Sequence, residues 1–178
     1  MLCPSCGHDN IPGVDLCDEC GSDLAGLDLP EAGSGVGGRL LTDAIADLPL
    51  APRVTATPEE TVATVVRRMR EERQGYAMVF EEDRLVGIFT ERDVLQRIVG
   101  KGTDPEATPV GEAMTPDPTT LRPQDPPAWA MHRMVSQDFR HLPIASGASG
   151  ASSGDVVGLL SIRGVLRYLY EDVLGGSG

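Results

Sequence analysis

The strongest constraint on this chain is an internal repeat of about 65 residues that begins near residue 40. Residues 55–60 align with residues 120–125 at an offset of 65 positions. Later in each copy the offset becomes 71, so that Gly87 aligns with Gly158. The extra residues fall in a stretch of Ser, Gly and Ala in copy two, which we interpret as a longer hairpin loop. Such self-similarity predicts two copies of one supersecondary unit that pack against each other.

Each copy predicts the element order β-α-β-β-α, and therefore an α+β fold. A short strand ends near a proline, and apolar residues at helical spacing follow it. Two apolar runs then predict a hairpin, and a final helix begins after a hydroxyl residue that can cap it. In copy one these segments are the helix with Val62, Val65, Val66 and Met69, the hairpin of 76–80 and 85–89, and the helix after Thr90. In copy two they are the helix with Ala130, Met131 and Met134, the hairpin of 141–145 and 156–160, and the helix after Ser161.

The net charge of −12 argues against nucleic acid as a partner, because nucleic-acid affinity depends mainly on basic groups that neutralise phosphates. No basic residue precedes Arg39, whereas seven acidic residues do. No segment reaches the roughly 18 apolar residues of a membrane span, and the N-terminus lacks the basic start and apolar run of a signal peptide. We therefore expect a cytoplasmic protein with no membrane partner.

Four cysteines within the first 20 residues form two C-x-x-C pairs that ten residues separate: Cys3, Cys6, Cys17 and Cys20. This spacing predicts a closed tetrahedral metal site in which each pair occupies one side of the ion. A glycine after each pair allows a tight turn beneath the sulfurs. Four thiolates suit Zn²⁺ best, with iron as the alternative metal. A redox dithiol or two disulfides are the competing interpretations, which the doubled pair and a reducing cytosol disfavour.

The first 24 residues resemble the short zinc-ribbon family through Cys-Pro-Ser-Cys-Gly and Cys-Asp-Glu-Cys-Gly. The resemblance implies a structural knuckle that contacts a protein partner and performs no catalysis. Residues 25–39 are rich in Gly, with Ser and Pro, which predicts a flexible linker. We therefore expect the ribbon to move independently of the repeats.

The motif from Gly87 to Asp93 joins a strand to a helix and concentrates polar groups at the helix N-terminus. Free backbone N–H groups and the helix dipole favour a phosphate at such a place. Thr90 could bind a phosphate or a sugar hydroxyl, Arg92 could pair with phosphate, and Asp93 could accept both hydroxyls of a ribose. These residues alone leave an alternative open, in which Thr90 and Asp93 only cap the helix and Arg92 faces water.

The pattern Gly-hydrophobic-hydrophobic-Thr-x-Arg-Asp after a hairpin, in a unit present twice, resembles the CBS domain family. Two further segments match that family, namely residues 110–116 as the linker into copy two and residues 140–144 as its second strand. The resemblance spans about residues 40–172. It implies that the repeats associate into a pseudo-symmetric, disc-like module, and that such modules form homodimers. It also implies that adenosine nucleotides, such as AMP, ADP, ATP or S-adenosylmethionine, bind in the clefts between the repeats.

The resemblance further implies which residues would contact the nucleotide. In the first cleft Thr90 and Asp93 would contact ribose and phosphate, and Thr55 would border the base or sugar. In copy two Gly164 stands where the family has an acidic residue, so the second cleft lacks its main ribose anchor and we expect one competent site. The full candidate set is Thr55, Gly87, Thr90, Arg92, Asp93, Thr120, Arg140, His141, Pro143, Ser161 and Arg163.

These observations predict a regulatory module that binds an adenosine nucleotide and is not an enzyme. The chain shows no nucleophile–base pair, and its three histidines are scattered. The alternative is a structural or scaffold protein with vestigial clefts, whose ribbon docks a protein partner. The expected divisions are a ribbon at 1–24, a linker at 25–39, repeats at 40–100 and 101–172, and a tail at 173–178.

Overall fold

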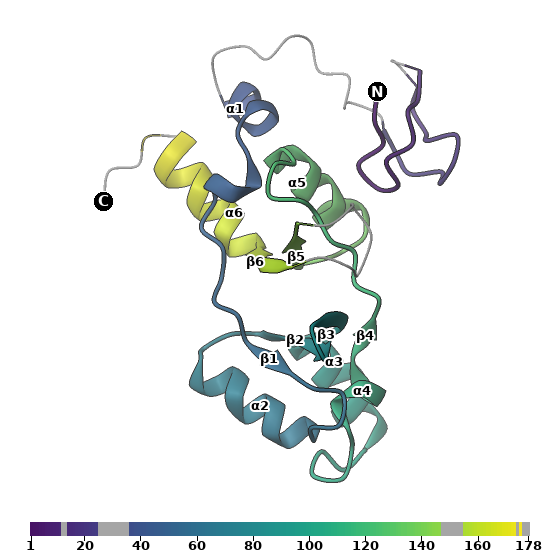
Figure 1. Cartoon of the computed structure of the whole chain (residues 1–178), viewed down its shortest axis with the longest axis vertical. Coiled ribbons are helices and arrows are strands. Elements are labelled where there is room, and N and C mark those ends of the chain that lie inside the picture. Colours follow the sequence, from purple (N-terminus) through teal and green to yellow (C-terminus); the bar gives the residue numbers. More distant parts are fainter. Residues whose placement is uncertain (12–13, 25–35, 147–154, 174, 176–178) are drawn as a thin grey trace.

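The computed structural model describes residues 1–11, 14–24, 36–146, 155–173 and 175 (Figure 1). Two α+β units follow each other in the chain, and a small cysteine-rich knuckle precedes them, as the sequence predicts. In Figure 1 the first unit, blue to teal, lies below the second unit, green to yellow. No helix in the described part of the chain is long and apolar enough to cross a membrane.

The first unit is built on a four-stranded sheet with the order β1-β2-β3-β4. Strand β1 (Thr55–Ala56) runs parallel to β2 (Tyr76–Glu81). Strand β2 forms an antiparallel hairpin with β3 (Arg84–Thr90). The predicted hairpin is therefore confirmed, and the charged turn between its strands lies at the surface.

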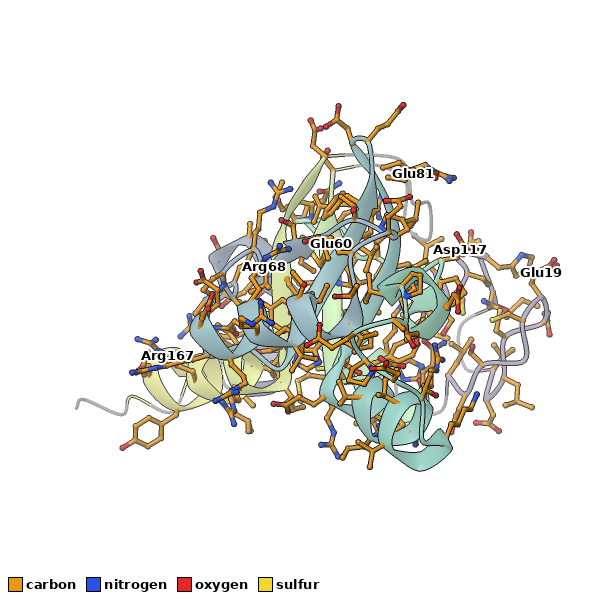
Figure 2. The ribbon with its side chains drawn as sticks, turned by 90° about the horizontal axis from the view of Figure 1, so that it is seen from below. Glu19, Glu60, Arg68, Glu81, Asp117 and Arg167 are labelled. Carbon is orange, nitrogen blue, oxygen red and sulfur yellow. The ribbon has the colours of Figure 1, made fainter. Side chains whose placement is uncertain are left out.

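Helix α2 (Val62–Glu71) connects β1 to β2. Thr61 caps its N-terminus by accepting a hydrogen bond from the Thr64 amide. On its surface the guanidinium of Arg68 pairs with Glu60, with Nη1 and Oε2 3.1 Å apart (Figure 2). The apolar face that the helical spacing predicts packs into the core, because its main residues are at most 3% exposed: Val62, Val65 and Met69.

The second unit repeats this design around a two-stranded sheet of β5 (His141–Ala145) and β6 (Val156–Ser161). Helix α5 (Pro127–Ser136) precedes the hairpin, and helix α6 (Ile162–Tyr168) follows it. The longer loop that we predict between these strands falls mostly on residues 147–154, which lie outside the described part.

Each sheet also pairs with the chain segment that leads into the other repeat. Strand β4 (Thr115–Pro116), which precedes the body of copy two, pairs with β3 of copy one. Ala51, which precedes β1 of copy one, forms a bridge with Leu159 of β6. Leu121 forms a parallel bridge with Ile144, as β1 does with β2 at the equivalent positions. The two repeats are therefore interlocked, although each is continuous in sequence.

A shared apolar core joins the two sheets. Side chains of one hairpin meet those of the other in a single buried cluster: Tyr76, Met78, Leu85, Ile88, Ala145, Val156 and Leu159. Each repeat has a further core under its own helices. Because buried apolar area stabilises by about 25 cal/mol per Å², the shared core holds the two repeats together.

Part of the segment that we expect to be a linker is helical. Helix α1 (Val36–Thr42) begins within it, whereas residues 25–35 lie outside the described part. Leu40 packs against the core of the second repeat, and the Tyr168 hydroxyl donates a hydrogen bond to Asp43 at 2.7 Å. Residues 36–39 therefore differ from the expectation, since tertiary contacts stabilise a helix that its glycines disfavour.

Candidate functional site

A cavity of about 210 Å³ opens between the two repeats at the edge of the shared core. Copy one lines it with Thr90, Arg92 and Asp93, where β3 ends and the next helix begins. Copy two lines it with Arg140 and His141, where β5 begins. The fold therefore brings five predicted site residues from both copies to one place.

Asp93 is fixed at the end of helix α3 (Glu91–Asp93), and only 8% of its side chain is exposed. Its Oδ2 accepts hydrogen bonds from the amide (2.9 Å) and the hydroxyl (2.7 Å) of Thr90. Its Oδ1 accepts a hydrogen bond from the Thr115 hydroxyl at 3.3 Å and lies 3.4 Å from Nε of Arg97. The capping interpretation of Thr90 and Asp93 is thus confirmed. These four contacts occupy the roughly four lone-pair sites of the carboxylate, so a ribose would bind there only by replacing donors such as the Thr90 and Thr115 hydroxyls.

Arg92 pairs with the second repeat and does not simply face water. Its Nη1 lies 2.8 Å from Oδ2 of Asp138, across the cavity that both residues line. The guanidinium holds the pKa of Asp138 below its usual value. Both side chains are well exposed, so solvent screens the pair and it contributes little to stability. An anionic ligand could therefore replace Asp138 as the partner of Arg92 at small cost.

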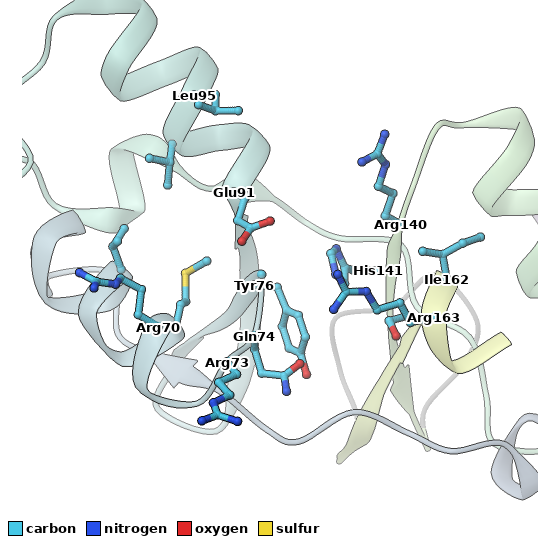
Figure 3. A pocket seen from close by; sticks show the side chains of 15 residues that line it. Arg70, Arg73, Gln74, Tyr76, Glu91, Leu95, Arg140, His141, Ile162 and Arg163 are labelled. Atoms are coloured by element: carbon cyan, nitrogen blue, oxygen red, sulfur yellow. The ribbon is translucent and has the colours of Figure 1, made fainter. Parts of the chain in front are cut away.

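A larger cavity of about 700 Å³ adjoins the first and shares Arg140 and His141 with it (Figure 3). In Figure 3 these two residues and Arg163 form the wall from copy two, opposite Arg70 and Arg73 of copy one. Within the described residues, none of these four arginines forms an ion pair. These four arginines outnumber the one carboxylate of the same cavity, Glu91, which favours a ligand that carries phosphate.

His141 lies between the two cavities in its neutral form. Burial, and then the charges of Arg140 and Arg163, lower its pKa to about 4. Its ring centroid lies 5.0 Å from that of Tyr76. The Tyr76 hydroxyl donates a hydrogen bond to the Pro52 carbonyl, and burial raises the pKa of this phenol to about 12. A phosphate beside the imidazole would raise the pKa of His141 again, because opposite charge favours the protonated form.

The equivalent position in copy two has no room for an acidic side chain. Ser161 caps α6 by accepting a hydrogen bond from the Gly164 amide at 3.1 Å, as Thr90 does from Asp93. A Cβ atom on Gly164 would lie only 2.8 Å from the carbonyl oxygen of Pro49. The segment of copy one that precedes β1 thus covers the place from which a ribose anchor would project, and this contact gives the predicted asymmetry a steric cause.

Four of the predicted nucleotide-binding residues line neither cavity. Thr55, in β1, lines a separate surface hollow together with Asp155 and Val156 of copy two. Gly87 packs beneath Met114, Thr120 is 1% exposed, and Pro143 is buried within β5. Ser161 and Arg163 line the larger cavity only. A family resemblance assigns binding roles by position in the sequence. It cannot show which of these residues are buried by other parts of the chain.

The small cavity is also lined by residues outside the candidate set. Glu91, Thr115 and Asp138 line it together with the predicted residues. Asp138 adopts a left-handed backbone with φ of 53°, a turn conformation that Asp tolerates better than most residues. Asp138 lies two residues before Arg140, a predicted site residue, and this closeness in sequence is the only signal that could have identified it as a cavity residue.

The four cysteines converge in the N-terminal knuckle, where they are all free thiols. Their sulfurs lie within 4.8 Å of one another, and two pairs are 3.6 Å apart: Cys3 with Cys20, and Cys6 with Cys17. Sulfurs around one tetrahedral zinc ion at about 2.3 Å would lie about 3.8 Å apart. Gly7 and Gly21 adopt φ of 77° and 67°, which makes the tight turns possible.

A buried amide supports the sulfur cluster from outside. Asn10 is 4% exposed, donates a hydrogen bond to Cys17 Sγ at 3.5 Å, and accepts one from the Asp18 amide at 3.0 Å. The Ser5 amide lies 3.4 Å from Cys3 Sγ and donates to it. Hydrogen bonds of this kind stabilise thiolates, so the donor set fits a tetrahedral metal ion.

The knuckle lies against α5 and is not separate from the repeats (Figure 1). Arg133 of that helix donates hydrogen bonds to the carbonyl groups of Pro4 and Ser5. This differs from the expectation of an independently moving ribbon, because a buried guanidinium in the second repeat requires acceptors that the knuckle provides.

Two proteins of known structure resemble the fold described above. A putative signal-transduction protein with CBS domains from Burkholderia ambifaria is 27% identical, with a TM-score of 0.65 over 74% of this chain and 94% of that chain. A CBS domain protein from Pyrobaculum aerophilum, solved in complex with AMP, is 27% identical, with a TM-score of 0.59 over 67% of this chain and 88% of that chain.

Relatives and a family model give the same result. A CBS domain-containing protein of Arabidopsis thaliana is 36% identical over 106 residues, which are 60% of this chain but 19% of that protein. The chain thus spans about a fifth of the length of such relatives. An uncharacterized 17.7 kDa protein of Acidianus ambivalens is 32% identical over 115 residues, 64% of this chain and 65% of that protein. The CBS domain model matches residues 45–100 and 110–171, most of the chain, and we conclude that the chain belongs to the CBS domain family and carries two CBS domains.

Proposed function

We propose that this protein is a non-catalytic regulatory module that binds an adenosine nucleotide between its CBS domains. The observation that carries the proposal is the pair of adjoining cavities, which place the carboxylate of Asp93 near arginines without ion-pair partners. A carboxylate suits the two hydroxyls of a ribose, and guanidinium groups suit phosphates. The AMP complex of the Pyrobaculum aerophilum protein supports this class of ligand.

In this proposal the ribose lies against Asp93 and Thr90, and the phosphates extend from the small cavity into the larger one. Arg140 lines both cavities and would contact the phosphates wherever they cross between them. Arg163 lines only the larger cavity, so it would matter more for ATP than for AMP. The obstruction by Pro49 at the equivalent turn of copy two supports a single nucleotide site.

The proposal is tested by isothermal titration of AMP, ADP and ATP into the wild type, Asp93→Asn and Asp138→Asn. We expect Asp93→Asn to weaken binding about tenfold or more, because it removes a charged acceptor for ribose hydroxyls. Asp138→Asn is the matched control, since it alters a carboxylate of the same cavity that faces Arg92. We expect this control to bind equally or more tightly. If a folded Asp93→Asn protein binds the nucleotides with unchanged affinity, the assignment of Asp93 as the ribose-binding residue is wrong.

A scaffold protein with vestigial clefts is the second candidate. Three apolar side chains of the knuckle are exposed to solvent: Leu2 at 50%, Ile11 at 72% and Leu16 at 58%. Exposed apolar groups of this kind favour a protein contact there. A nucleotide at one hundred times its dissociation constant stabilises the native state by about 2.7 kcal/mol, which raises Tm by about 5–10 °C for a chain of this size. If AMP, ADP, ATP and S-adenosylmethionine all leave Tm unchanged, the scaffold function is favoured.

We further propose that the four cysteines hold Zn²⁺ in a structural role. The closed sulfur set leaves no position for a substrate, and it would stabilise a knuckle whose own core is very small. Elemental analysis of protein purified without added metal distinguishes zinc from iron. Titration of the metal-free protein with Co²⁺ should give the intense absorption of cobalt thiolates, and Cys6→Ser should remove most of it.

We also propose a homodimer formed through the final helices of the two repeats. Leu95 and Val99 of copy one are 64% and 67% exposed. At the offset of 71 they correspond to Leu166 and Tyr170 of copy two, which are both 59% exposed. Light scattering after size exclusion should therefore give a dimer. Leu95→Glu with Leu166→Glu should give a monomer, whereas Val135→Glu, on α5 at 83% exposure, should not.

A further inference from the structure

Two arginines at equivalent positions of the repeats have different partners. Arg68 and Arg133 are related by the offset of 65 residues. Each donates a hydrogen bond to the carbonyl group of an equivalent threonine, Thr55 in copy one and Thr120 in copy two. Arg68 directs its remaining donors to Glu60 of its own repeat. The corresponding donors of Arg133 bind outside the repeat.

The acidic partner has changed in copy two. Asp125 stands at the position of Glu60 and has one methylene group fewer. The amide and Nε of Arg122 donate hydrogen bonds to its two oxygens, at 2.7 Å and 3.0 Å. Glu60 accepts the equivalent amide hydrogen bond from Thr57, so the difference in copy two is that the Arg122 side chain pairs with Asp125. The charge of Asp125 still acts on Arg133, but the Arg133 donors are directed toward the N-terminal knuckle.

Arg133 binds the loop that carries the first two cysteines. Its Nε donates to the Pro4 carbonyl, and its Nη2 donates to the Ser5 carbonyl at 3.2 Å. The residue is 2% exposed, and burial lowers its pKa from the usual value. A buried guanidinium without hydrogen-bond acceptors destabilises the folded state. The carbonyl groups of Pro4 and Ser5 supply two of the acceptors that offset this cost.

Both carbonyl groups lie between Cys3 and Cys6, so their positions depend on how these two cysteines are held. The apolar core of the knuckle consists of two cysteines, Leu24 and partly buried neighbours, which is too small to order the loop alone. Four thiolates around a divalent ion would also carry a net charge of about −2, which the nearby guanidinium compensates.

We propose that the ribbon docks on α5 through Arg133 and that the bound metal maintains this contact, so that metal binding orders the second CBS domain. The inference rests on the metal site proposed above. It makes the ribbon a part of the module, with α5 as its docking surface. Loss of metal would release the loop, leave Arg133 without two acceptors and loosen α5.

Several groups at the contact between the knuckle and α5 can report whether the knuckle is bound. Trp129, the single tryptophan, lies one helical turn before Arg133 and therefore on the same face of α5. His132 Nε2 and Ser5 Oγ are buried and have no hydrogen-bond partner among the described residues. The charge of Asp23 in the knuckle also reaches His132. Emission from Trp129 and exchange of α5 amides should both respond when the ribbon leaves.

The test compares hydrogen exchange of α5 amides in the full chain with Zn²⁺ and with EDTA, for the wild type, Arg133→Gln and Arg68→Gln. We expect zinc to slow exchange in α5 about tenfold in the wild type, as the loss of one or two charged hydrogen bonds implies. Arg68→Gln is the matched control, because it removes the equivalent arginine without touching the ribbon, and it should keep this response. Arg133→Gln should lose it while still binding metal.

A measurement on the unaltered protein makes the test independent of folding in the variants. The Nε proton of Arg133 should give a slowly exchanging NMR signal with zinc that disappears with EDTA. If Co²⁺ titration shows no thiolate binding, the metal site itself is wrong. If metal binds but α5 exchange, Trp129 emission and the Nε signal do not change, the docking proposal is wrong. Equal protection of α5 in Arg133→Gln and the wild type would also overturn it.

Discussion

Replacement of Gly164 by alanine should destabilise this protein, although glycine is normally unfavourable in a helix. Gly164 lies in α6, where alanine would gain about 0.5–1 kcal/mol from helix propensity. The added Cβ, however, would lie 2.8 Å from the Pro49 carbonyl oxygen, which is backbone and cannot rotate away. Such overpacking costs typically about 1–3 kcal/mol. Taking the middle of each range, we expect a net loss of about 1 kcal/mol, or about 2–4 °C in Tm.

Gly37→Ala provides the matched control. Gly37 also lies in a helix, α1, but a Cβ there meets nothing within 4 Å, so the substitution should be neutral or stabilise by up to about 1 kcal/mol. Urea unfolding followed by circular dichroism measures both variants. If Gly164→Ala is as stable as Gly37→Ala, Pro49 does not obstruct this turn, and the explanation for the missing acidic residue is wrong. Under our explanation Gly164→Asp would not create a second nucleotide site.

Three further predictions concern stability. The pKa of His141 is about 4 in the folded protein against 6.5 when unfolded, so the unfolded state binds more protons between these values. Stability should be full above pH 6.5 and fall by about 3 kcal/mol toward pH 4, which urea unfolding at several pH values would show; His141→Gln should flatten this dependence. Phe89→Ala should cost about 3–5 kcal/mol, measured in the same way, because Phe89 is 0% exposed in the core of copy one. Tyr168→Phe should lower Tm by about 2–4 °C in calorimetry, since it removes the hydrogen bond to Asp43, the residue that follows α1.

Much of the local structure was predictable because it depends on neighbours in sequence. The spacing of Val62, Val65 and Met69 predicts a helix with one buried face, and that face is buried. Thr90 and Ser161 were predicted to cap helices, and both accept the expected backbone hydrogen bond. The CBS resemblance, and with it the fold class, is confirmed by the family match over both repeats.

The candidate site was predictable only in part. Thr90, Asp93, Arg140 and His141 meet at one cavity, as the resemblance implies. Thr120 does not, because it is packed inside copy two, and no pattern in the sequence distinguishes a covered threonine from an open one. The nucleotide roles of these residues remain predictions that the titrations above address.

The sequence by itself determined the duplication, the order of helices and strands, and the cysteine spacing, since all of these follow from residues that are close in the chain. The tertiary structure alone decided three other features: the pairing of β4 with the sheet of copy one, the contact of Pro49 with Gly164, and the docking of the knuckle on Arg133. Each joins segments that are remote in sequence, and sterics and the burial of charge act through space. The two copies therefore share one order of helices and strands but differ in the contacts that surround equivalent positions.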